Sequence, residues 1–194
     1  RVGGRGWTQD GGRPHAEVGA LSQAGEAARG ATAYVTLDPC NHHGQTGPCA
    51  EALITAGVAR VVIACPDPNP VAEGGAARLR DAGIEVTQDV LRAEAEAAHR
   101  GFLSVQRRGR PMVTLKLAAS LDGRIATASG ESKWITGPAA RRQVHGMRAR
   151  HDAVLVGAGT ARADDPSLTV RGLGIGHQPV RVVVSRRVDL PVSG

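Results

Sequence analysis

The sequence predicts an α/β fold organised as two domains, and three observations support this. Apolar segments rich in β-branched residues alternate with Ala-rich amphipathic segments, which is typical of layered α/β structure with mainly parallel strands. A basic stretch with Gly and Pro, residues 106–111, predicts a domain boundary, because Gly ends helices and the residue before Pro avoids helical geometry. The chain has 194 residues, 41% of them hydrophobic, which suits one large domain or two small ones.

The first domain, residues 1–108, is expected to hold three strands and four helices. Each expected strand is a short apolar run, and the expected helices are Ala-rich, with Pro14 opening the first of them. In chain order, these elements are helix 14–28, strand 32–37, helix 48–56, strand 60–64, helix 75–82, strand 84–87 and helix 93–107.

The second domain, residues 111–194, is expected to contain few strands and therefore a thin, incomplete core. The Gly-rich residues 157–160 could open a helix toward a phosphate, but an ordinary turn is preferred, because the third Gly of the dinucleotide fingerprint is missing. The expected elements are the apolar strand 112–119, a helix near 138–150, and strands 153–156 and 180–184.

Three residues of the first domain have the composition of a zinc site. His15, Cys40 and Cys49 form a His/Cys/Cys set in which eight residues separate the two Cys. Zinc in hydrolytic sites takes three protein ligands and keeps its fourth position for water, whose pKa it lowers toward neutrality. Glu17 stands two residues after His15, where nucleobase deaminases place a Glu that moves protons without binding the metal. We therefore interpret Glu17 as the general acid/base of a catalytic zinc site.

Each of these residues could also have a purely structural role. His15 and Glu17 fall on the first turn of an expected helix, where polar groups also serve as caps. A disulfide between Cys40 and Cys49 is a further alternative, disfavoured because the sequence shows no secretory segment. Both Cys lie at strand-to-helix turns, where helix N-termini stabilise thiolates, and this favours zinc. Cys65 has no partner pattern and is expected to be a small buried residue.

Composition limits the possible partners. The net charge of +6 and the high pI suggest nucleic acid, but aromatic residues, on which unpaired bases stack, make up only 2% of the chain. Arg residues that bind one phosphate of a small substrate account better for the charge, so we expect no nucleic-acid partner. No segment is long or apolar enough to cross a membrane. The missing export signal and the need for reduced thiols favour a cytoplasmic location.

Six motifs carry a family resemblance over nearly the whole chain. They occupy residues 13–17, 36–49, 67–70, 116–124, 134–137 and 163–171. On these motifs the chain resembles the bifunctional deaminase/reductase of riboflavin biosynthesis. The long spacing between the Cys is specific, because related base deaminases usually separate them by two residues. The resemblance implies an α/β chain with a cytidine-deaminase-like three-layer domain followed by a partial dihydrofolate-reductase-like α/β domain.

For the first domain, the resemblance implies hydrolytic removal of the ring amine of 2,5-diamino-6-ribosylamino-4(3H)-pyrimidinone 5′-phosphate. His15, Cys40 and Cys49 would hold Zn²⁺, and Glu17 would transfer the proton. His42, Asp67 and Asn69 become candidate substrate contacts, although an Asp-Pro-Asn-Pro segment is also ordinary turn chemistry.

For the second domain, the resemblance implies reduction of 5-amino-6-(5-phosphoribosylamino)uracil with NADPH. Four positions match substrate contacts of the family: Ser132, Arg148, Leu168 and Arg171. Four others match its cofactor contacts: Ala118, Trp134, Thr160 and Asp164.

Departures from the family pattern bear on both activities. Compared with the family, the sequence lacks an N-terminal part of the deaminase domain and a C-terminal part of the reductase domain, so we expect this polypeptide alone not to be a competent reductase. A zinc deaminase of another base or nucleoside remains an alternative, because the zinc chemistry is shared and pocket contacts choose the substrate. A zinc-binding fragment without turnover is another, since unpaired strand edges seek a partner, including a second copy of the chain.

Overall fold

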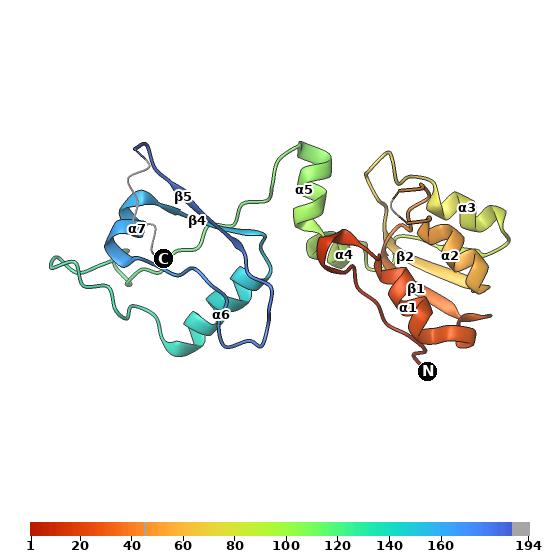
Figure 1. Cartoon of the computed structure of the whole chain (residues 1–194), viewed down its shortest axis with the longest axis horizontal. Helices are drawn as coiled ribbons and strands as arrows, with labels where there is room; N and C mark the ends of the chain where they lie inside the picture. Colours follow the sequence, from red (N-terminus) through yellow and green to blue (C-terminus); the bar gives the residue numbers. More distant parts are fainter. Residues whose placement is uncertain (45, 188–194) are drawn as a thin grey trace. The chain divides into compact units, whose positions relative to one another are not determined.

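The computed structural model describes residues 1–44 and 46–187 (Figure 1). The chain divides into two compact units, with the division after Thr114, and each unit contains its own parallel sheet. No helix in the described residues is long and apolar enough to span a bilayer.

The first unit is built on a three-stranded parallel sheet in the order β1-β2-β3. The strands are β1 (Thr32–Leu37), β2 (Arg60–Cys65) and β3 (Glu85–Thr87). Parallel neighbours need crossover connections, which α2 (Cys49–Ala56) and α3 (Gly75–Asp81) supply. Consequently the carboxyl ends of β1 and β2 lie at the same edge of the sheet, where both predicted Cys ligands are found nearby.

The core of this unit lies between the sheet and the three helices packed on it. Leu53 of α2, Leu79 of α3, and Val61 and Ile63 of β2 are almost completely buried, and Leu21 of α1 (Ala16–Ala24) packs against their cluster. Burying side chains of this size contributes about 1.5–3 kcal/mol each to folding. This packing holds the first turns of α1 and α2 at the edge of the sheet that bears the site.

The N-terminal helix is shorter than predicted. Pro14 precedes α1 instead of opening it, and the helix begins after the N-cap residue His15. It ends at Ala24 and continues as the 3-10 helix η2 (Gly25–Ala28), because Gly25 adopts a left-handed φ of 54°. A further short 3-10 helix, η1 (Asp10–Gly12), precedes α1.

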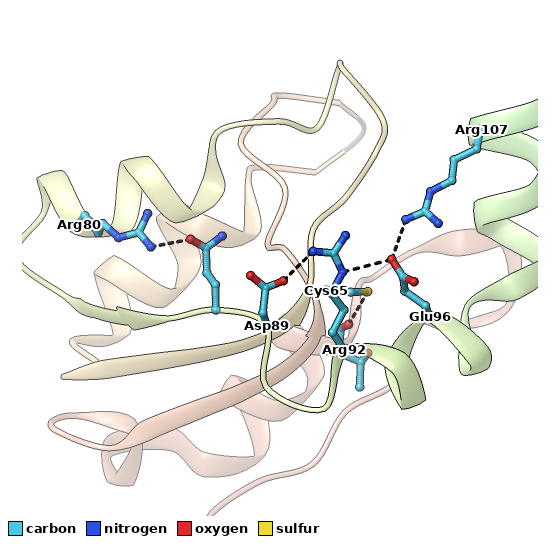
Figure 2. A network of polar contacts seen from close by, with 8 residues as sticks. Cys65, Arg80, Asp89, Arg92, Glu96 and Arg107 are labelled. Carbon is cyan, nitrogen blue, oxygen red and sulfur yellow. Dashed lines mark hydrogen bonds and ion pairs between the residues drawn. The ribbon is translucent and has the colours of Figure 1, made fainter.

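The expected helix 93–107 is two helices, α4 (Arg92–Ala98) and α5 (Arg100–Arg108), which meet at His99. The His99 ring lies 2.9 Å (Nε2) from Thr36 Oγ1, so a contact with β1 fixes the break. Figure 2 shows the polar contacts that join the two helices. Glu96 of α4 accepts hydrogen bonds from Arg92 (3.3 Å) and from Arg107 of α5 (2.8 Å), so α4 and α5 are held together.

The second unit contains a two-stranded parallel sheet of β4 (Ala153–Gly157) and β5 (Val180–Val184). Helix α6 (Pro138–Ala149) precedes it, and α7 (Ala158–Asp164) follows β4 directly. The Gly-rich turn preferred for residues 157–160 is therefore wrong. Gly157 is the N-cap of a helix whose Ala161 is buried, and this packing offsets the weak helix preference of the turn residues.

The predicted strand 112–119 is also wrong for the described structure. The segment has the alternating apolar pattern of a strand, but its backbone pairs with no described strand. Val113, Leu115 and Leu117 are 85%, 80% and 71% exposed. A strand needs a neighbouring strand to form hydrogen bonds with its backbone. The alternation of apolar and polar residues indicates only that the side chains suit a sheet.

Candidate active site

The three predicted zinc ligands come from three different elements of the first unit and meet in one cluster. His15 is the N-cap residue of α1, Cys40 follows β1, and Cys49 is the first residue of α2. Their candidate ligand atoms all lie within 4.8 Å of one another, and both Cys are buried. Residues 25 and 34 positions apart in sequence are thus brought together by the β1–α2 crossover and the N-terminus of α1.

His15 presents Nδ1 to both sulfurs. The distances from His15 Nδ1 are 3.3 Å to Cys49 Sγ and 3.5 Å to Cys40 Sγ. The backbone N–H of Cys49 donates to Cys40 Sγ at 3.4 Å. A His nitrogen facing two Cys sulfurs, with no further ligand in the cluster from the described residues, leaves room for a fourth, non-protein ligand.

The two neighbouring sulfurs have pKa values shifted in opposite directions. The pKa of Cys40 is lowered to about 4, first by the hydrogen bond from the Cys49 thiol and then by the Cys49 N–H and His15. The pKa of Cys49 is raised, first by its interaction with the Cys40 sulfur, then by burial and by the Glu17 carboxylate. A divalent cation between the sulfurs removes this conflict, because a coordinating thiol is deprotonated outright. The donor set therefore fits Zn²⁺.

Glu17 lies in the first turn of α1, two residues beyond the His15 ligand and half-buried. Its carboxylate is close enough to Cys49 to raise the pKa of that thiol both by charge and by a hydrogen bond. The side chain is thus next to the cluster but outside the three-ligand set. This is the placement needed by a group that moves protons at a metal site.

The candidate substrate contacts of the first domain border the same cluster. Burial raises the pKa of Asp67, and so does the nearby Cys40, while His42 and His15 lower it. Asp67 Oδ1 accepts the N–H of Asn69 at 2.9 Å, so the turn chemistry expected of this segment is present. His42 Nδ1 is buried and has no hydrogen-bond partner among the described residues. Such an atom is available to a ligand.

A close backbone contact, which the sequence did not indicate, positions Cys40. A Cβ on Gly75, the first residue of α3, would lie 1.7 Å from the Pro39 carbonyl oxygen and 3.2 Å from Asp38 Oδ1. Only glycine permits α3 to approach the residue before Cys40 so closely. The neighbouring Asp38 carboxyl has its pKa raised to about 6, chiefly by burial. The adjacent glycines Gly74 and Gly75 are the feature of the sequence that could have indicated this close contact.

In the second unit, three of the four predicted substrate contacts gather around one loop. Arg148 of α6 donates to the Thr169 carbonyl oxygen at 3.0 Å, and Arg171 donates to Thr169 Oγ1 at 3.3 Å. Burial lowers the pKa of Arg148, and the charge of Arg171 lowers it further. Leu168, next to Thr169 in the same loop, is buried and has a left-handed φ of 53°. Two guanidinium groups thus lie close together, and guanidinium groups are well suited to bind an anion.

The remaining predicted residues of the second unit do not share a described contact with that loop. Thr160 and Asp164 lie one turn apart on α7, and both are exposed. Trp134 is 71% exposed, with the Arg141 guanidinium 4.2 Å from its ring centroid. Ser132 and Ala118 are half-buried in segments without regular secondary structure.

Together, the His/Cys/Cys cluster with its adjacent Glu and the separate α/β unit define a deaminase-type zinc domain joined to a second, reductase-type domain. Residues 4–65 match the model of the cytidine and deoxycytidylate deaminase zinc-binding region. Residues 111–194 match the model of the RibD C-terminal domain.

Curated relatives cover both regions in one chain. The riboflavin biosynthesis protein RibD of Escherichia coli is 53% identical over 97% of this chain and 52% of its own length. That of Haemophilus influenzae is 59% identical over 87% of this chain and 45% of its own length. The chain thus spans about half the length of the curated relatives it matches.

Solved structures similar to this chain belong to the same family. Acinetobacter baumannii RibD superposes with a TM-score of 0.89 at 52% identity, covering 100% of this chain and 56% of that one. A diaminohydroxyphosphoribosylaminopyrimidine deaminase/5-amino-6-(5-phosphoribosylamino)uracil reductase from Thermotoga maritima gives 0.84 at 43% identity, over 95% of this chain and 56% of that one. The chain belongs to the RibD family of riboflavin biosynthesis proteins, which confirms the family and the fold class inferred from its motifs.

Proposed function

We propose that residues 1–108 catalyse the zinc-dependent deamination of 2,5-diamino-6-ribosylamino-4(3H)-pyrimidinone 5′-phosphate. The observation that carries this proposal is the meeting of His15, Cys40 and Cys49 within 4.8 Å, with Glu17 beside them. The name of the Thermotoga maritima neighbour supplies the substrate class.

In this proposal, His15, Cys40 and Cys49 hold Zn²⁺, which when bound lowers the pKa of a water in its fourth position. Glu17 takes a proton from the attacking water and delivers it toward the departing ring amine, so that a C–N bond is replaced by a C–O bond and ammonia leaves. His42, Asp67 and Asn69, which border the cluster, orient the pyrimidine.

We further propose that residues 111–194 contribute to an NADPH-dependent reductase. Arg148, Leu168, Arg171 and Ser132 would contact the phosphoribosylaminouracil, and Ala118, Trp134, Thr160 and Asp164 the cofactor. Support comes from the match to the RibD C-terminal domain and from the paired guanidinium groups at Thr169. We also propose that the protein is cytoplasmic, that it assembles with a second copy of itself, and that it has no nucleic-acid partner.

Glu17→Gln tests the deaminase directly, because it removes the proton carrier and leaves the three ligands in place. We expect stoichiometric zinc in both proteins, ammonia release by the wild type, and a loss of roughly 10²–10⁴-fold in the variant. The measurement pairs metal content with ammonia release from the diaminopyrimidine phosphate. Equal rates for Glu17→Gln and wild type would refute the role of Glu17, and zinc without turnover in either would refute the activity.

A further inference from the structure

The N-terminal segment, residues 3–7, lies with its backbone directly against α1. A Cβ on Gly6 would lie 1.9 Å from the Ala16 carbonyl oxygen and 2.7 Å from the Ala20 backbone nitrogen. Real Cβ atoms essentially never come within 3.0 Å of such atoms, so glycine alone fits at position 6. The φ of Gly6 is not positive, and the requirement for glycine therefore comes from the lack of space and not from the backbone conformation.

A second contact of the same kind lies further along α1. A Cβ on Gly4 would lie 2.2 Å from the Ala20 carbonyl oxygen and 3.0 Å from the Ala24 backbone nitrogen. Between the two glycines, the N–H of Arg5 donates to Gln23 Oε1 at 2.6 Å. The N-terminal segment is thus held along the helix by two close backbone contacts and one hydrogen bond.

The first turn of α1 needs such support because it has no side-chain cap. His15 is the N-cap residue, but its side chain makes no capping hydrogen bond with any described residue, and its Nδ1 faces the two sulfurs of the cluster. The first four N–H groups of a helix have no intrahelical partner, so an uncapped first turn is weakly held. Gly6 lies against Ala16, which stands between His15 and Glu17 in the sequence. The contact is therefore made where α1 carries both the candidate metal ligand and the candidate proton carrier.

We propose that Gly6 is a positioning residue for Glu17. Because it lets the N-terminal segment lie directly on Ala16, it fixes the direction of the first turn of α1, and with it the placement of the Glu17 carboxylate beside the cluster. The inference rests on the proposed deaminase function, in which Glu17 moves protons. A proton carrier has to lie within hydrogen-bond reach of the reacting group, so a displaced first turn slows the chemical step more than it weakens substrate binding.

Gly6→Ala and Gly4→Ala form a matched pair of variants. Each adds one Cβ that overlaps a carbonyl oxygen of α1, but only Gly6→Ala does so in the first turn. Ala20 lies inside the helix, next to Leu21, which packs against the core. An overlap at Ala20 is therefore relieved by movement of the N-terminal segment, whereas an overlap at Ala16 displaces the uncapped first turn.

Both variants should be less stable than the wild type in denaturant unfolding, and kinetics at saturating zinc should separate them. For Gly6→Ala we expect kcat for ammonia release to fall roughly 10- to 100-fold with KM little changed. Gly4→Ala should keep most of its kcat. Equal losses of kcat in the two variants, or a full kcat in Gly6→Ala, would overturn the inference.

The absorption spectrum of the cobalt-loaded protein tests the same point without turnover. Co²⁺ binds to the same kinds of ligand as Zn²⁺, and its visible bands depend on their geometry. Gly6→Ala should shift these bands, because His15 adjoins the displaced turn, whereas Gly4→Ala should reproduce the spectrum of the wild type. Identical spectra for all three proteins would show that the first turn is not displaced, and the inference would be wrong.

Gln23→Ala decides the question if Gly6→Ala does not fold. It removes the acceptor of the Arg5 N–H and loosens the N-terminal segment without adding an overlap. We expect a loss of kcat at unchanged KM and zinc content, and an unchanged kcat would contradict the inference.

Failure of the proposed function would be visible separately. A zinc-loaded wild type that releases no ammonia, while its cobalt spectrum still differs from that of Gly6→Ala, would refute the deaminase but support the positioning of the first turn. A wild type that shows no cobalt bands would refute both, because the first turn would then position no metal ligand.

Discussion

At the scale of single residues, the three cysteines differ in what surrounds each sulfur. Cys40 and Cys49 face His15 and fit a metal, whereas Cys65, at the end of β2, is 0% exposed. The Cys65 thiol donates to the Thr36 carbonyl oxygen at 3.2 Å, and burial raises its pKa. A buried thiol with a raised pKa is a poor nucleophile at neutral pH.

Thiol titration should therefore proceed in steps. We expect no cysteine of the zinc-loaded protein to react quickly with a thiol reagent. Once a chelator removes the metal, Cys40, whose pKa is lowered, should react first, whereas Cys49 and Cys65, both buried with a raised pKa, should react only when the protein unfolds. Because the pKa of Cys65 is raised, increasing the pH moderately above neutrality should not make its thiol reactive. Rapid labelling of Cys65 in the native protein, identified by mass spectrometry, would contradict this assignment.

At the scale of elements, the approach of α3 to the turn after β1 positions one metal ligand. We expect Gly75→Ala to destabilise the first unit by about 1–3 kcal/mol, because its Cβ would overlap the Pro39 carbonyl oxygen. Zinc affinity should fall with stability, since Pro39 adjoins Cys40. Gly47→Ala is the matched control, because a Cβ there would meet nothing within 4 Å. Denaturant unfolding and competition with a zinc indicator measure both effects, and equal behaviour of the two variants would disprove the coupling.

The joint between α4 and α5 depends on the charge of Glu96. Arg107, and then Arg92, lower the pKa of Glu96, so the folded state favours its ionised form. This contribution is present above the ordinary pKa of 4.5 and is lost as the pH falls through the lowered value. Glu96→Gln should lower the melting temperature slightly at pH 7, and the difference should shrink as the pH falls below the ordinary pKa of 4.5. Glu94→Gln, on the same helix and without a described ion pair, removes only a charge in the first turn and should have a smaller effect than Glu96→Gln at pH 7. A difference for Glu96→Gln that persists in acid would show that the charge of Glu96 is not what stabilises the joint.

At the scale of the whole molecule, the sequence predicted what depends on local order and missed what depends on distant partners. The strands at 32–37 and 180–184 match β1 and β5, and the zinc cluster was inferred from residue types and spacing alone. The break at His99 was missed because it depends on Thr36, 63 positions away. The strand 112–119 was wrong because alternation shows which faces are apolar but supplies no pairing partner. Arg13 was part of a motif, yet its hydrogen bond to Thr46, 33 positions away, became visible only in three dimensions.

The two units offer separate optical reporters for the effect of the metal. The chain has two tryptophans, Trp7 in the first unit and Trp134 in the second, so Trp134→Phe and Trp7→Phe each leave one unit with a fluorescent probe. All three candidate ligands belong to the first unit. A metal that binds the folded cluster stabilises that fold by mass action, by about 2.7 kcal/mol when free zinc exceeds its Kd 100-fold. We therefore expect a chelator to lower the unfolding temperature reported by Trp7 and to leave that reported by Trp134 unchanged. A shift seen by Trp134 would mean that the second unit depends on the folded first unit, and no shift in either would mean that the cluster does not hold a metal that contributes to folding.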